Sequence, residues 1–182
     1  MPKSKSAYSV PGKIGKTERH IIVVWVDNEA GVLARVVGLF SGRGYNIESL
    51  AVAEVDQKQN ISRITIVTTG TPQVIDQIKL QLKKLVPVHK VADFKREDKN
   101  VIFKEMALFK FVANNKKLIS ALNACRNYNP VVLDQTKKSQ VIQITALRRE
   151  IDKMSKNLTK FGLVSVSRTG AVAMTRGSEI FK

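Results

Sequence analysis

Hydrophobic and polar positions alternate between strand-like and helix-like patterns from residue 20 onward. Residues 21–26 form an unbroken apolar run rich in β-branched side chains. Such a run predicts a strand buried on both faces, or nearly so. An apolar stripe with helical spacing follows and predicts a helix packed on a sheet; its members are Leu33, Val36, Val37 and Phe40.

Two segments with strict alternation come next and predict a hairpin. Residues 46–54 and 61–69 alternate apolar and polar positions, and polar residues 55–60 join them. Gly70-Thr71-Pro72 then predicts the start of a second helix, with threonine as cap and proline in the first turn. The apolar stripe of this helix is Ile75, Ile78, Leu82 and Leu85. A short strand over residues 87–91 completes the order βαββαβ, a ferredoxin-like unit with both helices on one face of an antiparallel sheet.

The second half of the chain repeats this order after a run of polar, mostly charged residues at 95–100. The same patterns predict helices over residues 116–128 and 149–161. They predict strands over 105–112, 130–133, 141–145, 163–168 and 171–174. The fold class is therefore α+β, with two ferredoxin-like βαββαβ domains.

These patterns also divide the chain into segments. Residues 1–19 are basic, lack an apolar stretch and are expected to be a disordered tail without a secretory signal. The expected domains span residues 20–94 and 104–176, with a linker at 95–103 and a loose tail at 177–182.

Cysteine usage and hydropathy indicate the cellular compartment of the protein. Cys125 is the single cysteine and lies on an apolar helix face, which favours a small core side chain over a reactive thiol. No run of about 18 apolar residues occurs, so no membrane span is predicted. A reducing, cytoplasmic compartment fits both observations.

Net charge is the least ordinary feature of the composition. The chain carries +16, of which residues 1–19 contribute +4, residues 20–95 +2 and residues 96–182 +10. A high charge invites a nucleic-acid interpretation. The basic residues are scattered, however, and aromatic residues make up only 6% of the chain, without a stacking platform. A solvated lysine-rich surface, or one complementary to an acidic protein partner, is favoured.

Catalytic and metal-binding patterns are absent from the sequence. The chain has no P-loop, and the Gly42–Gly44 pair lacks the third glycine of a dinucleotide-binding turn. His20 and His89 have no cysteine or histidine at metal-ligand spacing and are expected to be ordinary strand residues. No catalytic and no metal residue is assigned.

The turn after the first strand is the strongest candidate for binding. Gly31 directly precedes an apolar helix, whose free N–H groups favour an anion such as a carboxylate. We expect the second strand to carry Asn46 back beside Asn28, so that two amide side chains read the two ends of a small zwitterion. Alternatively, Asn28 simply caps the helix as an ordinary turn residue. The sheet edge near Ile47 suits a dimer seam with a ligand between subunits.

A family resemblance extends this interpretation. The segment DNEAGVLARVVGLFSGRGYNIESL, continuing through ISRITI and QLKKLVPVHKV, resembles the small regulatory subunit of acetolactate synthase (acetohydroxyacid synthase). The ending VSRTGAVAMTRG resembles the C-terminus of the same family. The resemblance implies an N-terminal ACT domain, an amino-acid-sensing module, followed by a C-terminal ACT-like domain.

The resemblance also implies a ligand and its site. A dimer of ACT domains would bind the feedback inhibitor valine, or isoleucine or leucine, at the interface. The pocket falls on Asn28, Gly31, Val32, Asn46 and Ile47. The N–H groups around Gly31 and Val32 would hold the carboxylate, the two asparagines the polar ends, and Ile47 the aliphatic side chain.

The implied partner is the catalytic large subunit, which would carry thiamine diphosphate, magnesium and FAD, whereas this chain would carry no cofactor. The chain would activate that subunit and make it sensitive to valine. Two alternatives remain open. One is a stand-alone ACT-domain amino-acid sensor with another partner, and the other is a basic nucleic-acid-binding protein.

Overall fold

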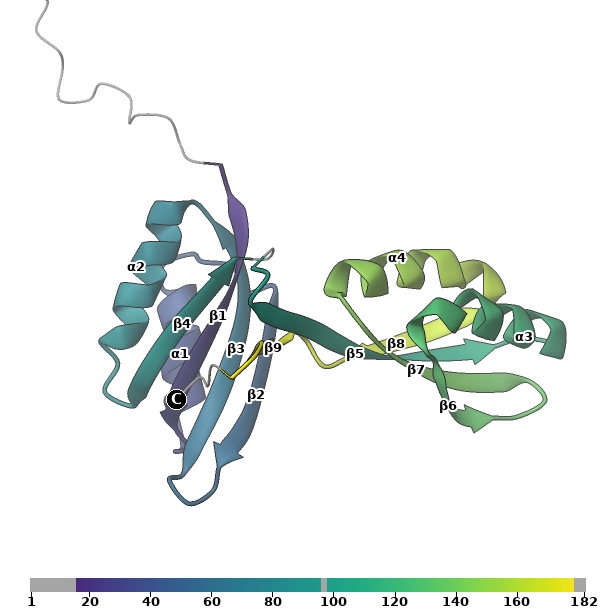
Figure 1. The fold of residues 1–182 in the computed structure, drawn as a ribbon, viewed down its shortest axis with the longest axis horizontal. Coiled ribbons are helices and arrows are strands. Elements are labelled where there is room, and N and C mark those ends of the chain that lie inside the picture. Colours follow the sequence, from purple (N-terminus) through teal and green to yellow (C-terminus); the bar gives the residue numbers. More distant parts are fainter. Residues whose placement is uncertain (1–15, 96–97, 179–182) are drawn as a thin grey trace, which may run out of the picture.

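The first domain contains a four-stranded antiparallel sheet with two helices. The computed structural model describes residues 16–95 and 98–178. Strand order is β2-β3-β1-β4, and the βαββαβ order predicted from the sequence is confirmed (Figure 1). The elements are β1 Glu18–Asp27, α1 Val32–Ser41, β2 Ser49–Asp56, β3 Ile61–Gly70, α2 Pro72–Lys83 and β4 Val88–Lys95.

The second domain repeats the arrangement with the strand order β6-β7-β5-β8. Its helices also end in short 3-10 turns, at Arg126–Tyr128 and Thr159–Phe161. The α+β class with two βαββαβ units is therefore confirmed. The elements are β5 Val101–Val112, α3 Asn115–Ala124, β6 Val131–Gln135, β7 Ser139–Ala146, α4 Arg148–Leu158, β8 Leu163–Arg168 and β9 Val172–Thr175.

β5 belongs to both halves of the molecule. Its first residues, Val101–Lys104, pair with β9, whereas Glu105–Val112 pair with β7 and β8. Figure 1 shows β5 reaching from the first sheet into the second, with β9 returning beside its first half. The linker expected at residues 95–103 therefore overlaps two strands, because Lys95 ends β4 and residue 101 already begins β5.

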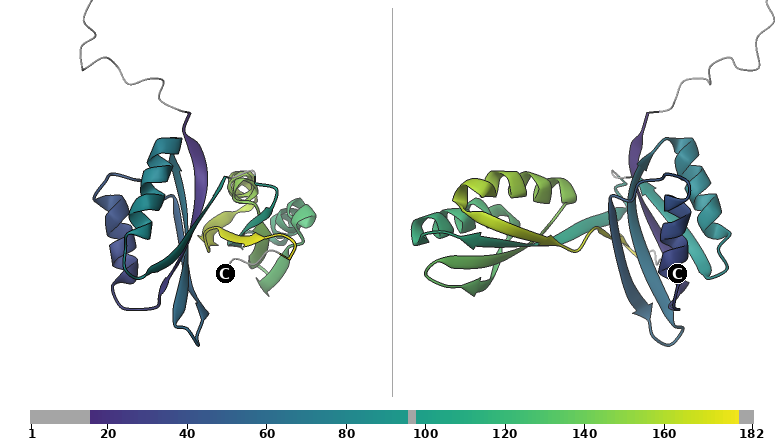
Figure 2. Two further views of the ribbon diagram at one scale, coloured as in Figure 1. Left: turned by 60° about the vertical axis from the view of Figure 1, so that its left-hand side comes forward. Right: turned by 180° about the vertical axis from the view of Figure 1, so that it is seen from behind.

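β1 is buried on both faces, as its apolar run predicted. Ile22, Val24 and Val26 face α1 and α2 in one core. Figure 2 shows both helices on this face and the second domain beyond the other face. On that other face, residues from the C-terminal half complete a separate apolar cluster, whose members are Ile21, Val23, Trp25, Val67, Val101, Ala171 and Ala173.

Three local expectations differ from the structure. α1 buries Val32, Val36, Leu39 and Phe40, and Leu33 is 40% exposed, so the predicted stripe was one residue out of phase at its start. Nearly every position of this helix is apolar, so the pattern does not set its rotation. The second strand begins at Ser49 rather than at residue 46. Glu18 and Arg19 of the expected tail belong to β1, while residues 1–15 and 179–182 lie outside the described residues.

The single cysteine and the two histidines have ordinary structural surroundings. Cys125 is fully buried in the second core, and burial raises the pKa of its thiol from 9.0 to about 11. His20 pairs with Asp93 at 2.7 Å, and His89 pairs with Asp27 at 2.6 Å. Across residues 16–95 and 98–178, no cluster of metal-ligating side chains occurs. Within the same ranges, no helix has the length and apolar character to cross a membrane.

Candidate ligand-binding site

The turn between β1 and α1 has the backbone geometry expected of an anion cradle. Gly31 precedes α1 with φ of 84°, a left-handed conformation that favours glycine. A Cβ at this position would meet no atom within 4 Å, so the space above the turn is open. The Val32 N–H reaches Glu29 O only at 3.4 Å, and the first N–H groups of a helix lack intrahelical acceptors. The turn therefore presents a positive helix end toward solvent.

Asn28 is fixed by its neighbours and does not cap α1. Its backbone N–H donates to Asn60 O at 2.7 Å, and its Oδ1 accepts from Ser62 Oγ at 2.9 Å. Since α1 has no side-chain cap, the alternative interpretation of Asn28 as a helix cap is wrong. With Oδ1 occupied by Ser62, the exposed Asn28 side chain presents its NH2 group as a donor.

Val32 can contribute only its backbone. Its side chain is 3% exposed and belongs to the core beneath the two helices. The Val32 methyl groups cannot contact a ligand that lies above the turn. Any role at the site therefore falls to its N–H group.

Asn46 and Ile47 lie at the opposite end of the sheet. They precede β2, where Asn46 O accepts from Thr68 Oγ1 at 2.7 Å. In the sheet Thr68 pairs with His20, whereas Asp27 pairs with Ile61 at the far end of β1. Within one chain, the structure therefore does not bring Asn46 beside Asn28.

The expectation about Asn46 failed because of strand direction. β1 and β2 are both antiparallel to β3, so they run in the same direction and α1 crosses back between them. The start of β2 consequently lies beside the start of β1 and away from the β1–α1 turn.

β2 forms one free edge of the first sheet, within the described residues, and an apolar groove runs beside it. The groove has a volume of about 660 Å³ and lies between β2, β5 and β9. Several of its apolar side chains are more than one third exposed: Val52, Ile102, Val172 and Met174, together with Val55. A free strand edge beside exposed apolar side chains is typical of a surface that pairs with another chain.

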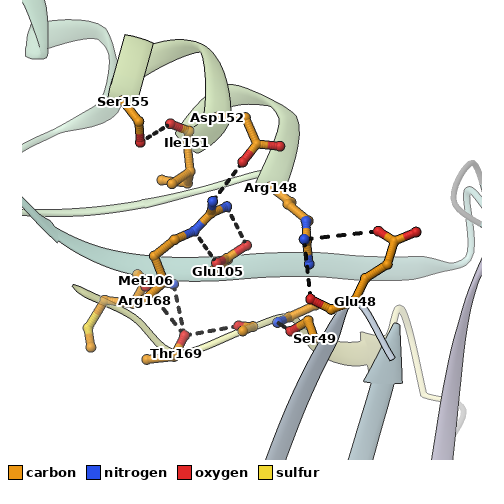
Figure 3. Close-up of polar contacts among 12 residues, drawn as sticks. Glu48, Ser49, Glu105, Met106, Arg148, Ile151, Asp152, Ser155, Arg168 and Thr169 are labelled. Carbon is orange, nitrogen blue, oxygen red and sulfur yellow. Dashed lines mark hydrogen bonds and ion pairs between the residues drawn. The ribbon is translucent and has the colours of Figure 1, made fainter. Parts of the chain in front are cut away.

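The residues after Ile47 connect the first domain to the second (Figure 3). Glu48 Oε2 lies 2.8 Å from Arg19 and 4.0 Å from Arg148, and Arg148 also donates to Glu48 O at 3.5 Å. Ala171 N–H donates to Ser49 Oγ at 3.4 Å. The segment that holds Asn46 and Ile47 therefore continues directly into contacts with α4 and the chain before β9.

Arg168 forms a second set of ion pairs beside this junction. It donates to Glu105 at 2.6 and 3.1 Å and to Asp152 at 2.7 Å (Figure 3). Burial lowers the pKa of Arg168, but the bonds to both carboxylates outweigh burial and the pKa lies above its ordinary value. Arg168 thereby joins β8, β5 and α4.

Sequence reasoning missed this junction. Arg148 is one of the scattered basic residues, and Glu48 and Ser49 lie in the alternating segment 46–54, so the pattern did not single out any of the three. One signal was present, because Glu105 is the single acidic residue of β5 and is 2% exposed. A buried carboxylate requires a cationic partner.

Comparison with known families identifies both domains. Residues 22–90 match the model for the AHAS small subunit-like ACT domain. Residues 104–177 match the model for the small subunit of acetolactate synthase.

Curated relatives and a crystal structure agree with these matches. The acetolactate synthase small subunit of Aquifex aeolicus is 37% identical over 91% of this chain and 85% of its own length. The probable small subunit of Archaeoglobus fulgidus is 33% identical over 88% of this chain and 99% of its own. The crystal structure of the Thermotoga maritima small subunit has a TM-score of 0.78 and 31% identity, covering 88% and 99%. The chain therefore belongs to the ACT-domain family of acetolactate synthase small subunits, the regulatory, non-catalytic chains of that enzyme.

Proposed function

We propose that this chain binds valine between two copies of its ACT domain and thereby regulates the catalytic subunit of acetolactate synthase. Isoleucine and leucine share the features that such a site would recognise. In this proposal the chain acts in the cytoplasm, raises the activity of the large subunit and confers feedback inhibition. The thiamine diphosphate, magnesium and FAD of the reaction belong to the large subunit.

The observation that carries the proposal is the direction of the free edge strand β2. A two-fold axis pairs an edge strand with its own copy in antiparallel fashion. The start of β2 in one subunit then lies beside the end of β2 in the other. Asp56 at the end of β2 and Asp27 at the end of β1 both pair with Ile61, so this is the end where α1 begins.

Such a dimer assembles the predicted residue set from two chains. Asn28 and the turn at Gly31 would come from one subunit, and Asn46 and Ile47 of the partner subunit would complete the pocket. The helix end and the Asn28 NH2 group suit a carboxylate. The Asn46 side-chain oxygen suits an ammonium group, and Ile47 suits a branched aliphatic side chain. The apolar groove beside β2 would be covered in the same dimer.

Regulation then requires valine to favour one arrangement of the complex. A bound effector shifts an equilibrium only by its difference in affinity for the two states. Couplings of this kind amount to about 1–3 kcal/mol. The contacts of Glu48 and Ser49 with the second domain offer a direct route, because they adjoin Ile47 in the sequence.

The decisive experiment is a valine titration of the reconstituted complex with a Gly31→Asp variant. A carboxylate at Gly31 repels the valine carboxylate, and a side chain at φ of 84° is strained. We expect valine inhibition to be weakened at least tenfold, with activation of the large subunit retained.

Gly38→Ala is the matched control for this titration. Gly38 lies inside α1 with open space around it, so alanine fits and valine inhibition should not change. Equal inhibition of wild type and Gly31→Asp would refute the pocket. Failure of the chain to co-purify with a thiamine-diphosphate enzyme would instead refute the proposed partner.

A further inference from the structure

A separate cavity lies between the two domains, away from the β1–α1 turn. It has a volume of about 320 Å³, at the small end of the range for ligand pockets. Arg19 and Ile21 of β1 line one wall, and the start of α4 lines another. Lys104 and Phe103 of β5 contribute to the same cavity. The walls therefore come from both domains.

The cavity carries more positive than negative charge. Arg19, Lys104, Arg148 and Arg149 line it, and the only acidic lining residue among those described is Glu105. Glu105 is already bound by Arg168 through two hydrogen bonds.

Nearby carboxylates do not neutralise the four cations. Glu48 alone forms ion pairs with both Arg19, at 2.8 Å, and Arg148, at 4.0 Å. Within residues 16–95 and 98–178, the structure records no ion pair or hydrogen bond for the side chains of Lys104 and Arg149. The start of α4 adds no unpaired charge, because the Glu150 carboxylate in its first turn accepts from the Leu147 N–H group at 3.0 Å. Two cationic side chains therefore face the cavity without an acidic partner.

The remaining walls of the cavity are apolar and favour a ligand with an aliphatic part. They are formed by Ile21, Val67, Phe103, Leu147 and Ala171. A zwitterion would need a free carboxylate for its ammonium group. Glu48 and Glu105 are bound by arginines, and Glu150 is bound by the Leu147 N–H group. A fully hydrated anion such as phosphate would leave the apolar walls unused.

The geometry points to a binding site for a small organic carboxylate with an aliphatic body and no ammonium group. Its carboxylate contacts Lys104 and Arg149, and its aliphatic part lies against Phe103 and Leu147. An occupant of this kind touches both domains at once and stabilises their mutual orientation. This site goes beyond the proposed valine pocket and shares none of its residues.

Direct titration of the full chain without the large subunit tests the site. The probe is isovalerate, which has the carbon skeleton of valine without the ammonium group, and binding is measured by calorimetry. We expect saturable binding of isovalerate and no binding of its neutral amide. Isobutyrate, propionate and acetate form a series in which each member has one carbon fewer. Each loss of a carbon should weaken binding by about fourfold.

Two variants locate the bound anion. Lys104→Ala/Arg149→Ala removes the two unpaired cations, both exposed, and should weaken isovalerate binding at least tenfold. Lys153→Ala/Lys156→Ala removes the same two positive charges from exposed positions of α4 outside the cavity and should leave binding unchanged.

Three other outcomes would contradict the proposed carboxylate site. An equal effect of the control would indicate nonspecific attraction, and equally tight binding of inorganic phosphate would exclude an organic carboxylate as the preferred ligand. Absence of saturable binding would refute the site. Gly31→Asp should retain isovalerate binding, so failure of the valine pocket and failure of this site give different results.

Discussion

Gly31 and Asn28 show how far single residues could be assigned from the sequence. The glycine before an apolar helix indicated an open helix end, and the left-handed φ of 84° agrees. The role of Asn28 could not be resolved in the same way, because its partner Ser62 lies 34 residues later. Asn46 was misplaced for a related reason, since its position depends on the direction of β2 rather than on nearby residues.

Cys125 provides a prediction about alkaline stability. Below pH 9 its thiol is protonated in both the folded and the unfolded chain. Between pH 9 and about 11 only the unfolded chain ionises, because burial raises the folded pKa. The free energy of unfolding should therefore fall across this window as pH rises. Urea titrations at several pH values should show a shallower fall in Cys125→Ala, and an identical fall in both proteins would contradict the assignment.

At the scale of elements, periodicity gave the number, type and order of helices and strands in both domains. It was weakest where nearly all positions are apolar, as in α1, and at ends set by tertiary pairing, as at Ser49. β9 was predicted as a strand, but its partner in β5 and its place against the first sheet were not foreseen. Local patterns do not encode which of two sheets a short strand joins.

The start of α3 provides a test at this scale. Asn114 Oδ1 accepts from Lys117 N–H at 3.0 Å and caps the helix. Asn114→Ala should lower the free energy of unfolding by about 1 kcal/mol, because a helix N–H group loses its acceptor. Asn115→Ala changes the same residue type one position later, outside the cap, and should alter stability by less than about 0.5 kcal/mol. Chemical denaturation measures both, and equal losses would contradict the cap.

For the whole molecule, the cluster around Trp25 joins the two halves, and the isolated patterns gave no indication of it. Trp25 is the single tryptophan and is 9% exposed, with Arg63 stacked 5.2 Å from its ring centroid. Ala173 is 4% exposed in the same cluster. Alternation along β1 separates the residues that face the helices from those that do not. The partners of the second group in the C-terminal half, Val101, Ala171 and Ala173, lie more than 70 residues away.

Ala173→Asp should separate β9 from the first sheet, because a carboxylate would be buried among apolar side chains. We expect Trp25 emission to shift to longer wavelength while the circular dichroism of the helices is retained. Val164→Asp, at a position of β8 that is 59% exposed, is the control and should leave the emission unchanged. An unshifted spectrum in a folded Ala173→Asp protein would contradict the packing of β9 on the first sheet.

The return of β9 to the first sheet has a consequence for biosynthesis. Ribosomes synthesise a chain from its N-terminus, so β1 to β4 emerge from the ribosome long before Ala171 and Ala173. These two alanines cover Ile21 and Val23 in the folded protein. During this interval the outer face of the nascent sheet stays open to water and to other chains. The N-terminal half therefore reaches its final packing only after β9 has been synthesised, and chains truncated before Ala171 should expose this apolar face and aggregate more readily than the full chain.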